Sequence, residues 1–172
     1  MTEREGIVGN GDIGRLLKEE VKVMPDLVFF VSGVSNSQEV RESEYQREKD
    51  LLLQQDRDKR LVYVSSLSIF YGDTRYTRHK REMEELIKEE FSRYTIFRLG
   101  NITWGDNPHT IINNLKSRVD NQEPIEIYDT HRYVVEPNEF LHWISLIPDF
   151  NCEINVPGER MKVRELVKRY VL

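Results

Sequence analysis

The sequence predicts an α/β fold in which a parallel β-sheet is flanked by helices. Short apolar runs, such as those at residues 27–31, 61–64 and 94–99, alternate along the chain with longer charged amphipathic segments. This alternation is typical of strand–helix repeats. A glycine-rich turn, Gly9-Asn10-Gly11-Asp12-Ile13-Gly14, follows the apolar pair Ile7-Val8 and precedes a helical pattern. Both observations indicate parallel strands joined by helices, with the turn at the first strand–helix junction.

The N-terminal part of the chain supplies strands and helices in strict alternation. Strands are expected where consecutive apolar residues are bounded by polar ones, and helices where apolar residues recur every three or four positions. In chain order these are a strand at residues 7–8, a helix at 13–23, a strand at 27–31, a helix at 43–55, a strand at 61–64, a helix at 76–91 and a strand at 94–99. The helix at 43–55 offers Tyr45, Leu51, Leu52 and Leu53 for packing.

The helix at residues 76–91 has the clearest periodicity. Its apolar residues recur at helical spacing and are expected in the core: Met83, Leu86, Ile87 and Phe91. The charged residues between them are expected on a solvated face: Glu84, Glu85, Lys88, Glu89 and Glu90. His79 points about 100° away from Lys80 around the helix axis, so it is expected at the surface rather than in a site.

A cluster of turn residues, Trp104-Gly105-Asp106-Asn107-Pro108, follows the strand at residues 94–99. Beyond it the pattern predicts a helix at 109–119, a short strand at 125–128, a helix at 139–147 and a final helix at 163–171. The chain contains no low-complexity linker and no internal repeat. Residues 1–172 are therefore expected to form a single domain.

The composition is that of an ordinary globular protein and narrows the classes of partner. The 172 residues are 38% hydrophobic and 32% charged, and a net charge of -5 argues against broad nucleic-acid or anionic-membrane binding. The single cysteine, Cys152, excludes an intramolecular disulfide and is expected to be an inert strand thiol in a reducing compartment. No long apolar segment follows residues 1–5, so no signal peptide or membrane span is expected. We therefore expect a cytoplasmic location. The histidines lack the spacing of zinc ligands, so no metal site is expected.

Tyr76 and Lys80 form the most informative pair of residues. A spacing of four on a helix places both side chains on one face. A phenol is a poor acid or base at neutral pH, and a cationic lysine one turn away favours its phenolate form. The alternative is a snorkelling surface lysine beside a half-buried tyrosine. Context favours proton transfer, because the strand at 61–64 runs into Ser65-Ser66 and ligands of parallel sheets bind at such strand ends.

The order of these motifs resembles the short-chain dehydrogenase/reductase superfamily. The glycine-rich turn is followed by Ser65-Ser66-Leu67-Ser68-Ile69-Phe70, by Tyr76-x-x-x-Lys80 and by Phe97-Arg98-Leu99-Gly100-Asn101-Ile102. The chain is more narrowly similar to the extended branch, the NAD-dependent epimerases and dehydratases of nucleotide sugars. The resemblance runs from about Ile7 to the C-terminus and implies a Rossmann-like parallel sheet.

The resemblance implies roles for individual residues. Tyr76, Lys80 and Ser66 take the catalytic positions, with Ser65 and Ser68 as rivals of Ser66. Cofactor contacts are implied for Gly9, Gly11, Asp12, Ile13, Gly14, Ser32, Gly33, Lys80, Gly100 and Asn101. Substrate contacts are implied for Ser68, Asn101 and Arg132, and residues 103–172 would form a small substrate-side region. Arg98 and Arg132 either face a nucleotide diphosphate or form structural salt bridges.

The chain departs from the family in length. Members have about 250 to 350 residues, as doubly wound folds with a substrate region do. Only eleven residues separate Gly14 from Asp26, enough for one helix and a turn but not for the rest of a nucleotide-binding half. The choice between NAD and NADP is therefore open, and the first strand is expected at a sheet edge. Such an edge is covered by residues 1–5 or by a second chain, so a homo-oligomer, such as a dimer, is expected.

The expected function is hydride transfer between NAD or NADP and a nucleotide-linked sugar, assisted by Ser66, Tyr76 and Lys80. Leu67 stands where a dehydratase of the resembling family needs an acid–base residue next to the serine, so reduction or epimerisation is favoured. The alternatives are a catalytically weak Rossmann-like binding or assembly subunit and a sensor of dinucleotides or nucleotide sugars. The shortened nucleotide-binding half favours the first alternative, and the joint presence of the three catalytic residue types opposes it.

Overall fold

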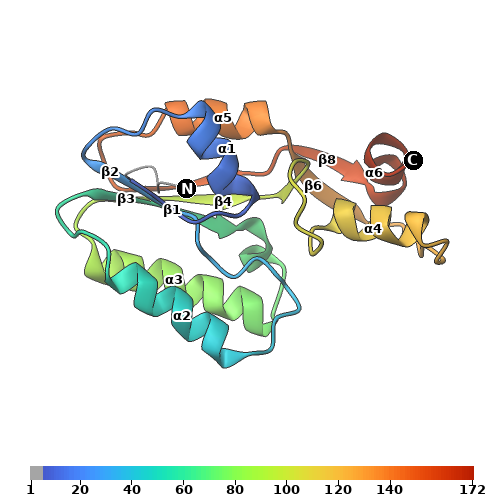
Figure 1. Cartoon of the computed structure of the whole chain (residues 1–172), viewed down its shortest axis with the longest axis horizontal. Coiled ribbons are helices and arrows are strands. Elements are labelled where there is room, and N and C mark those ends of the chain that lie inside the picture. Colours follow the sequence, from blue (N-terminus) through green and yellow to red (C-terminus); the bar gives the residue numbers. More distant parts are fainter. Residues whose placement is uncertain (1–5) are drawn as a thin grey trace.

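The computed structural model describes residues 6–172 and arranges them around two β-sheets (Figure 1). The larger sheet has the strand order β1-β2-β3-β4-β7, and each neighbouring pair is parallel. Its strands are β1 (Ile7–Val8), β2 (Leu27–Phe30), β3 (Arg60–Ser66), β4 (Tyr94–Leu99) and β7 (Cys152–Val156). The predicted α/β class with a parallel sheet is confirmed.

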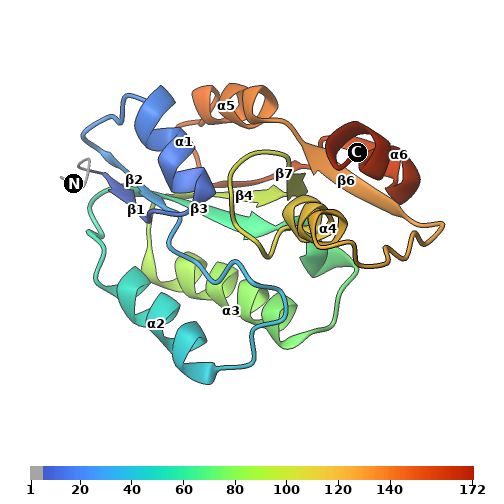
Figure 2. The ribbon, with the colours of Figure 1, turned by 45° about the vertical axis from the view of Figure 1, so that its right-hand side comes forward.

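Helices cover both faces of this sheet, as Figures 1 and 2 show. Helices α1 (Asp12–Glu20) and α5 (Pro137–Ser145) lie on one face, and α2 (Glu42–Leu53) and α3 (Arg75–Glu90) lie on the other. Successive strand residues point to opposite faces, so both faces carry apolar side chains and both need a helical cover. Phe29 therefore belongs to the core under α1 and α5, and its neighbour Phe30 belongs to the core under α2 and α3.

A second, smaller sheet lies at the end of the larger one (Figure 1). It consists of β5 (Asn101–Ile102), β6 (His131–Val135) and β8 (Glu159–Lys162), in the order β5-β6-β8. Helices α4 (Ile111–Asp120) and α6 (Val163–Tyr170) pack on it through a core that contains Ile112, Val134, Met161 and Leu166.

Gly100 joins the two sheets at a crowded point. A Cβ atom there would lie 2.6 Å from the Pro157 carbonyl oxygen and 2.9 Å from the Tyr133 carbonyl oxygen. Its amide donates to the Val156 carbonyl at 3.0 Å. Glycine is therefore required for the chain to pass from β4 to β5 beside two other backbone segments.

The six predicted helices and the strands at 7–8, 27–31, 61–64 and 94–99 are present, with ends shifted by a few residues. The predicted strand at residues 125–128 is wrong, because the strand of this region is β6, at His131–Val135. Ile127 and Tyr128 are 45% and 63% exposed, and they lie in the loop between α4 and β6. The two apolar residues in this segment are therefore not buried, and the segment does not form a strand.

Three side chains were assigned to the wrong environment. Glu84, predicted on the solvated face of α3, is 3% exposed, and Arg98 pairs with it. His79, predicted at the surface, is fully buried. Leu53, predicted to pack, is 41% exposed. In each case the helix itself was predicted correctly. The periodicity did not show which side chains a neighbouring helix or strand would cover.

The glycine-bearing strand β1 lies at the edge of the larger sheet, as predicted. Among residues 6–172 it pairs with β2, with Ile7 opposite Phe29 and Val8 opposite Phe30. The predicted cover by residues 1–5 lies outside the described part of the chain.

Candidate active site

The glycine-rich turn connects β1 to α1, and two of its glycines are required by the fold. Gly9 has a φ of +132°, and a Cβ on it would lie 2.6 Å from the Val31 carbonyl carbon and 2.8 Å from the Ser32 nitrogen. A Cβ on Gly14 would lie 2.5 Å from the Gly9 carbonyl oxygen. These glycines let the turn approach β2 closely and let α1 pack directly on the turn.

Gly11 is different, because neither its conformation nor its packing requires a glycine. Its φ is -72°, in the ordinary range, and no heavy atom lies within 4 Å of the position of an added Cβ. It is the N-cap of α1 and is exposed, without a side-chain capping bond. The open face above Gly11 suits a phosphate group that approaches the backbone amides at the start of a helix. The residues of the turn therefore fit a dinucleotide pyrophosphate.

Asp12 ties the start of α1 to the loop after β5. Its carboxylate accepts the backbone amides of Asp106 at 3.1 Å and Asn107 at 3.0 Å, and it pairs with Arg15. Gly105, with a φ of +89°, is pressed against the same carboxylate. The Asp12 side chain is thus fully engaged within the protein, so that Asp12 and Ile13 would contact a phosphate through their backbone amides.

Tyr76 and Lys80 share one face of α3, as their spacing predicts. The helix begins with a capping box in which the Thr74 hydroxyl accepts the Thr77 amide at 3.2 Å. The Lys80 Nζ lies 5.6 Å from the centre of the Tyr76 ring. Lys80 is 3% exposed, and a Cβ on Gly33 would lie 2.7 Å from its Nζ. The lysine head group is therefore buried directly against the end of β2, at the site where Gly33 was predicted to contact a cofactor.

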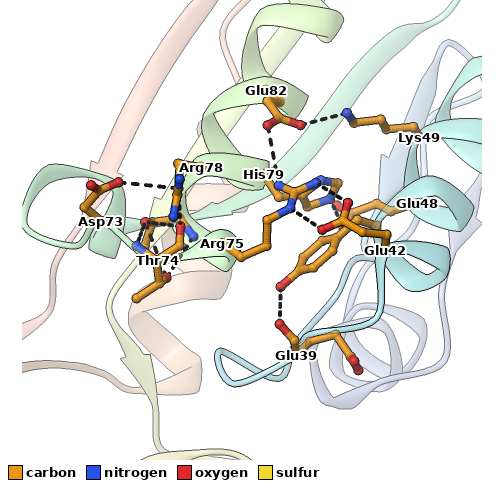
Figure 3. A network of polar contacts seen from close by, with 12 residues as sticks. Glu39, Glu42, Glu48, Lys49, Asp73, Thr74, Arg75, Arg78, His79 and Glu82 are labelled. Atoms are coloured by element: carbon orange, nitrogen blue, oxygen red, sulfur yellow. Dashed lines mark hydrogen bonds and ion pairs between the residues drawn. The ribbon is translucent and has the colours of Figure 1, made fainter.

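The carboxylate of Glu48, a residue that sequence reasoning missed, lies at the centre of this site. Glu48 is on α2 and fully buried. Its Oε1 accepts from Tyr63 Oη at 2.7 Å and from Lys80 Nζ at 3.1 Å, and its Oε2 accepts from the Val34 amide at 2.8 Å. His79 Nε2 lies 2.8 Å from the same Oε2, and Figure 3 shows the two side chains meeting between α2 and α3. The signal was present in the sequence, since Tyr45, Glu48 and Leu52 share the buried stripe of α2.

The electrostatics of this cluster follow from burial and mutual pairing. Burial opposes the charge on Glu48, but Lys80 and His79 outweigh it and hold the pKa of Glu48 well below its usual range. Burial also opposes the charge on Lys80, yet Glu48 and Tyr76 leave its pKa raised. Burial, then Glu48, raises the pKa of Tyr63 well above its ordinary value. The cluster is therefore a buried carboxylate–ammonium pair with Tyr63 as a neutral hydrogen-bonding partner.

The serines lie at the carboxyl end of β3. The Ser66 hydroxyl caps the 3₁₀ turn η1 (Leu67–Phe70) by accepting the Ser68 amide at 3.2 Å, and it lies 2.7 Å from the Ser68 hydroxyl. Ser65 is 4% exposed, and its hydroxyl has no hydrogen-bond partner among residues 6–172. Ser66 and Ser68 are thus hydrogen-bonded to each other at the strand end, whereas Ser65 is buried.

The polar residues Arg98 of β4 and Asn101 of β5 are both held by other parts of the protein. Arg98 pairs with Glu84 through three hydrogen bonds of 2.6 to 3.2 Å and with Glu153 at 2.6 Å, so it is a structural salt-bridge residue. The Asn101 amide donates to the Tyr133 carbonyl at 2.9 Å, which fixes its side chain against β6.

Arg132, on β6, forms hydrogen bonds with the two residues that precede it in the chain. It donates to the His131 carbonyl at 3.0 Å and to the Thr130 hydroxyl at 3.4 Å. The Tyr71 ring lies within electrostatic range of both Arg132 and Tyr76. Arg132 remains a candidate for an anionic ligand beside the tyrosine.

No group of three or more His, Cys, Asp or Glu side chains in residues 6–172 is arranged to hold a metal ion. None of the helices in that part of the chain has the length and apolar character needed to cross a membrane.

The architecture is a Rossmann-like parallel sheet with helices on both faces, the fold that the resemblance in sequence implied. No family model matches the chain, and no curated protein matches its sequence. Among solved structures it is similar to the Bordetella bronchiseptica enzyme WbmG in complex with NAD, with a TM-score of 0.66 and 16% identity over 91% of this chain and 58% of that one. It is also similar to the Thermus thermophilus UDP-glucose 4-epimerase complex with NAD, with a TM-score of 0.62 and 17% identity over 90% of this chain and 62% of that one.

A third similar structure is the dTDP-4-dehydrorhamnose reductase of Bacillus anthracis in complex with NADP. It has a TM-score of 0.68 and 17% identity, over 94% of this chain and 77% of that one. At these identities the similarity shows the fold. The chain spans little more than half the length of several of the proteins that it matches.

Proposed function

We propose that this chain binds NAD or NADP and assists hydride transfer to or from a carbon of a nucleotide-linked sugar, in a reduction or an epimerisation. The main support is Gly11, a glycine that the fold itself does not require and that leaves the backbone at the start of α1 open. Tyr76 and Lys80 lie together at the same strand ends. The similar solved structures include complexes with NAD and with NADP.

The residues of the site divide the chemical work. A nicotinamide held beside Ser32 and Gly33 supplies the hydride exchange. Tyr76 exchanges a proton with the sugar oxygen, and Lys80 holds the ribose of the nicotinamide. The Ser66 hydroxyl donates a hydrogen bond to the same sugar oxygen and polarises it. Arg132 pairs with the diphosphate of the substrate.

The first experiment is a titration of the purified protein with NADH and with NADPH, followed by fluorescence and thermal shift. We expect a Kd at or below about 100 μM for at least one of them and a melting temperature that rises with ligand concentration. Gly11→Val should abolish the response with little change in the melting temperature of the free protein, because its side chain enters open space. A wild-type protein that gives no response at millimolar concentrations would refute the proposal.

A second candidate, a binding or assembly subunit without turnover, is favoured by the sheet edge at β1. Two unpaired edges of backbone groups from two chains can pair, so the edge also supports a homo-oligomer. Sedimentation velocity measures the oligomeric state directly. Turnover distinguishes the candidates: an enzyme loses it in Tyr76→Phe, whereas a binding subunit shows none in the wild type and binds equally in both.

A further inference from the structure

Glu48 and Lys80 place two opposite charges in the interior, next to the proposed cofactor site. Glu48 is fully buried and Lys80 is 3% exposed, and their Oε1 and Nζ atoms are 3.1 Å apart. A buried charge is costly unless an opposite charge compensates it. Separating the two groups would leave each charge buried without compensation, so the position of one group fixes the position of the other.

The hydrogen bonds of the pair leave Glu48 no freedom to move. The two carboxylate oxygens take two contacts each, from Tyr63 and Lys80 and from Val34 and His79. A carboxylate has about four acceptor sites, so Glu48 is saturated. Its partners come from β3, from α3 and from the backbone after β2, so the carboxylate is anchored to three parts of the fold.

The hydrogen bonds of Lys80 are not saturated. Its ammonium has three N–H donors, and two are used by Glu48 Oε1 and by Tyr63 Oη, each at 3.1 Å. Added at Gly33, a Cβ atom would lie 2.7 Å from Nζ and 2.8 Å from Glu48 Oε1, so both groups press against the end of β2. Within residues 6–172, one donor is thus left without a partner, beside the backbone of Gly33.

We propose that Glu48 is the positioning residue of Lys80, which it holds against Gly33 so that one N–H donor is aimed at a ligand hydroxyl on the end of β2. The inference rests on the proposed function, since the ligand is the ribose of the nicotinamide. Glu48 does not itself touch the ligand. Without the Glu48 carboxylate, the Lys80 side chain is still present but has neither a counter-charge nor a fixed orientation.

The matched variants are Glu48→Gln and Glu84→Gln. Both remove a buried carboxylate from an ion pair, but Glu84 pairs with Arg98, and within residues 6–172 no hydrogen bond or ion pair joins it to Lys80. We expect Glu48→Gln to weaken NADH binding by about tenfold or more, as losing a charged hydrogen bond does, and Glu84→Gln to change it by less than about twofold. Equal losses in the two variants would overturn the proposal. Glu48→Asp retains the charge and replaces the glutamine variant if that one does not fold.

The pH dependence of binding provides a readout that a purely structural role would not move. Lys80 is faced by Glu48 and Tyr45 of α2, by Tyr63 of β3 and by Tyr76 of its own helix. Without the carboxylate, burial favours the neutral amine, so NADH binding by Glu48→Gln should fall from about pH 8 to about pH 10. Binding by the wild type and by Glu84→Gln should stay level over that range, and a parallel decline in all three would contradict the proposal.

Nuclear magnetic resonance of ¹⁵N-labelled lysine ammonium groups separates this proposal from the proposed function. The Lys80 signal, identified by its loss in Lys80→Met, should shift in Glu48→Gln and stay in place in Glu84→Gln, whether or not a ligand is present. If the wild type binds neither NADH nor NADPH, the proposed function fails while this measurement still tests the contact. An unshifted Lys80 signal in Glu48→Gln would overturn the positioning role even in a protein that binds NADH.

Discussion

Tyr76 is the residue whose hydroxyl must exchange the proton if the chain is an enzyme. It is half-buried, with the Lys80 ammonium 5.6 Å from its ring centre. Tyr76→Phe removes one oxygen atom and keeps the ring, so we expect kcat to fall by about 10² or more while the Kd for NADH changes by less than about threefold. Tyr94→Phe, at the opposite end of the sheet, is the control and should retain wild-type kcat. A matching loss of NADH binding in Tyr76→Phe would show that the hydroxyl is structural.

Glu48 also makes a prediction about stability and pH. Its pKa in the folded protein is depressed, so its stabilising effect is present above the unfolded value of about 4.3 and is lost as the pH falls below it. Glu48→Gln should lower the free energy of unfolding by about 3 kcal/mol at pH 7, because Lys80 loses its buried partner. The difference from wild type should narrow by about 1.4 kcal/mol for each pH unit below 4.3. Urea unfolding at pH 7 and pH 3.5 measures it, and a constant difference would contradict the depressed pKa.

Helix α3 is the element that presents both Tyr76 and Lys80, and its first turn depends on Thr74. The Thr74 hydroxyl accepts the Thr77 amide, and Thr110 makes the equivalent bond to the Asn113 amide at the start of α4. Thr74→Ala and Thr110→Ala should each lower the free energy of unfolding by about 1 kcal/mol. NADH binding should weaken in Thr74→Ala, because the turn that carries Tyr76 frays. Binding should not weaken in Thr110→Ala. Equal effects of the two variants on NADH binding would show that the Thr74 cap does not position Tyr76.

The elements also show what the sequence can predict. The parallel strands and the helices followed from apolar runs and helical periodicity, and the juxtaposition of Tyr76 and Lys80 followed from a spacing of four residues. These features depend on local order along the chain. Glu48 could not be assigned in this way, since its partners Tyr63, His79 and Lys80 are 15, 31 and 32 positions away. Its position in the apolar stripe of α2 indicates burial, but the partners emerge when α2 and α3 pack side by side.

The whole molecule differs from a complete doubly wound fold on one side of its sheet. In such folds a dinucleotide lies across two halves, and the half beyond the first strand contacts the adenosine ribose. Here α1 ends at Glu20, and the chain enters β2 at Leu27, so this connection runs directly back into the sheet beside β1. The proposed nicotinamide side of the site, with Gly33, Tyr76 and Lys80, is assembled from residues of one chain. The two ends of a bound dinucleotide are therefore expected to contribute unequally to its affinity.

This asymmetry predicts weak discrimination between the two cofactors. NADPH differs from NADH by a phosphate on the adenosine ribose, so a chain that contacts chiefly the nicotinamide half should bind both with Kd values within about threefold of each other. Reduced nicotinamide mononucleotide, which lacks the adenosine half, should bind within about tenfold of NADH, since it keeps the contacts near Gly33 and Lys80. Titrations of the three ligands under identical salt conditions test both expectations. A hundredfold preference for NADH or NADPH would instead require a protein contact at the adenosine ribose. The same titration, repeated at protein concentrations that favour the monomer or the oligomer, would show whether a second chain at the β1 edge provides that contact.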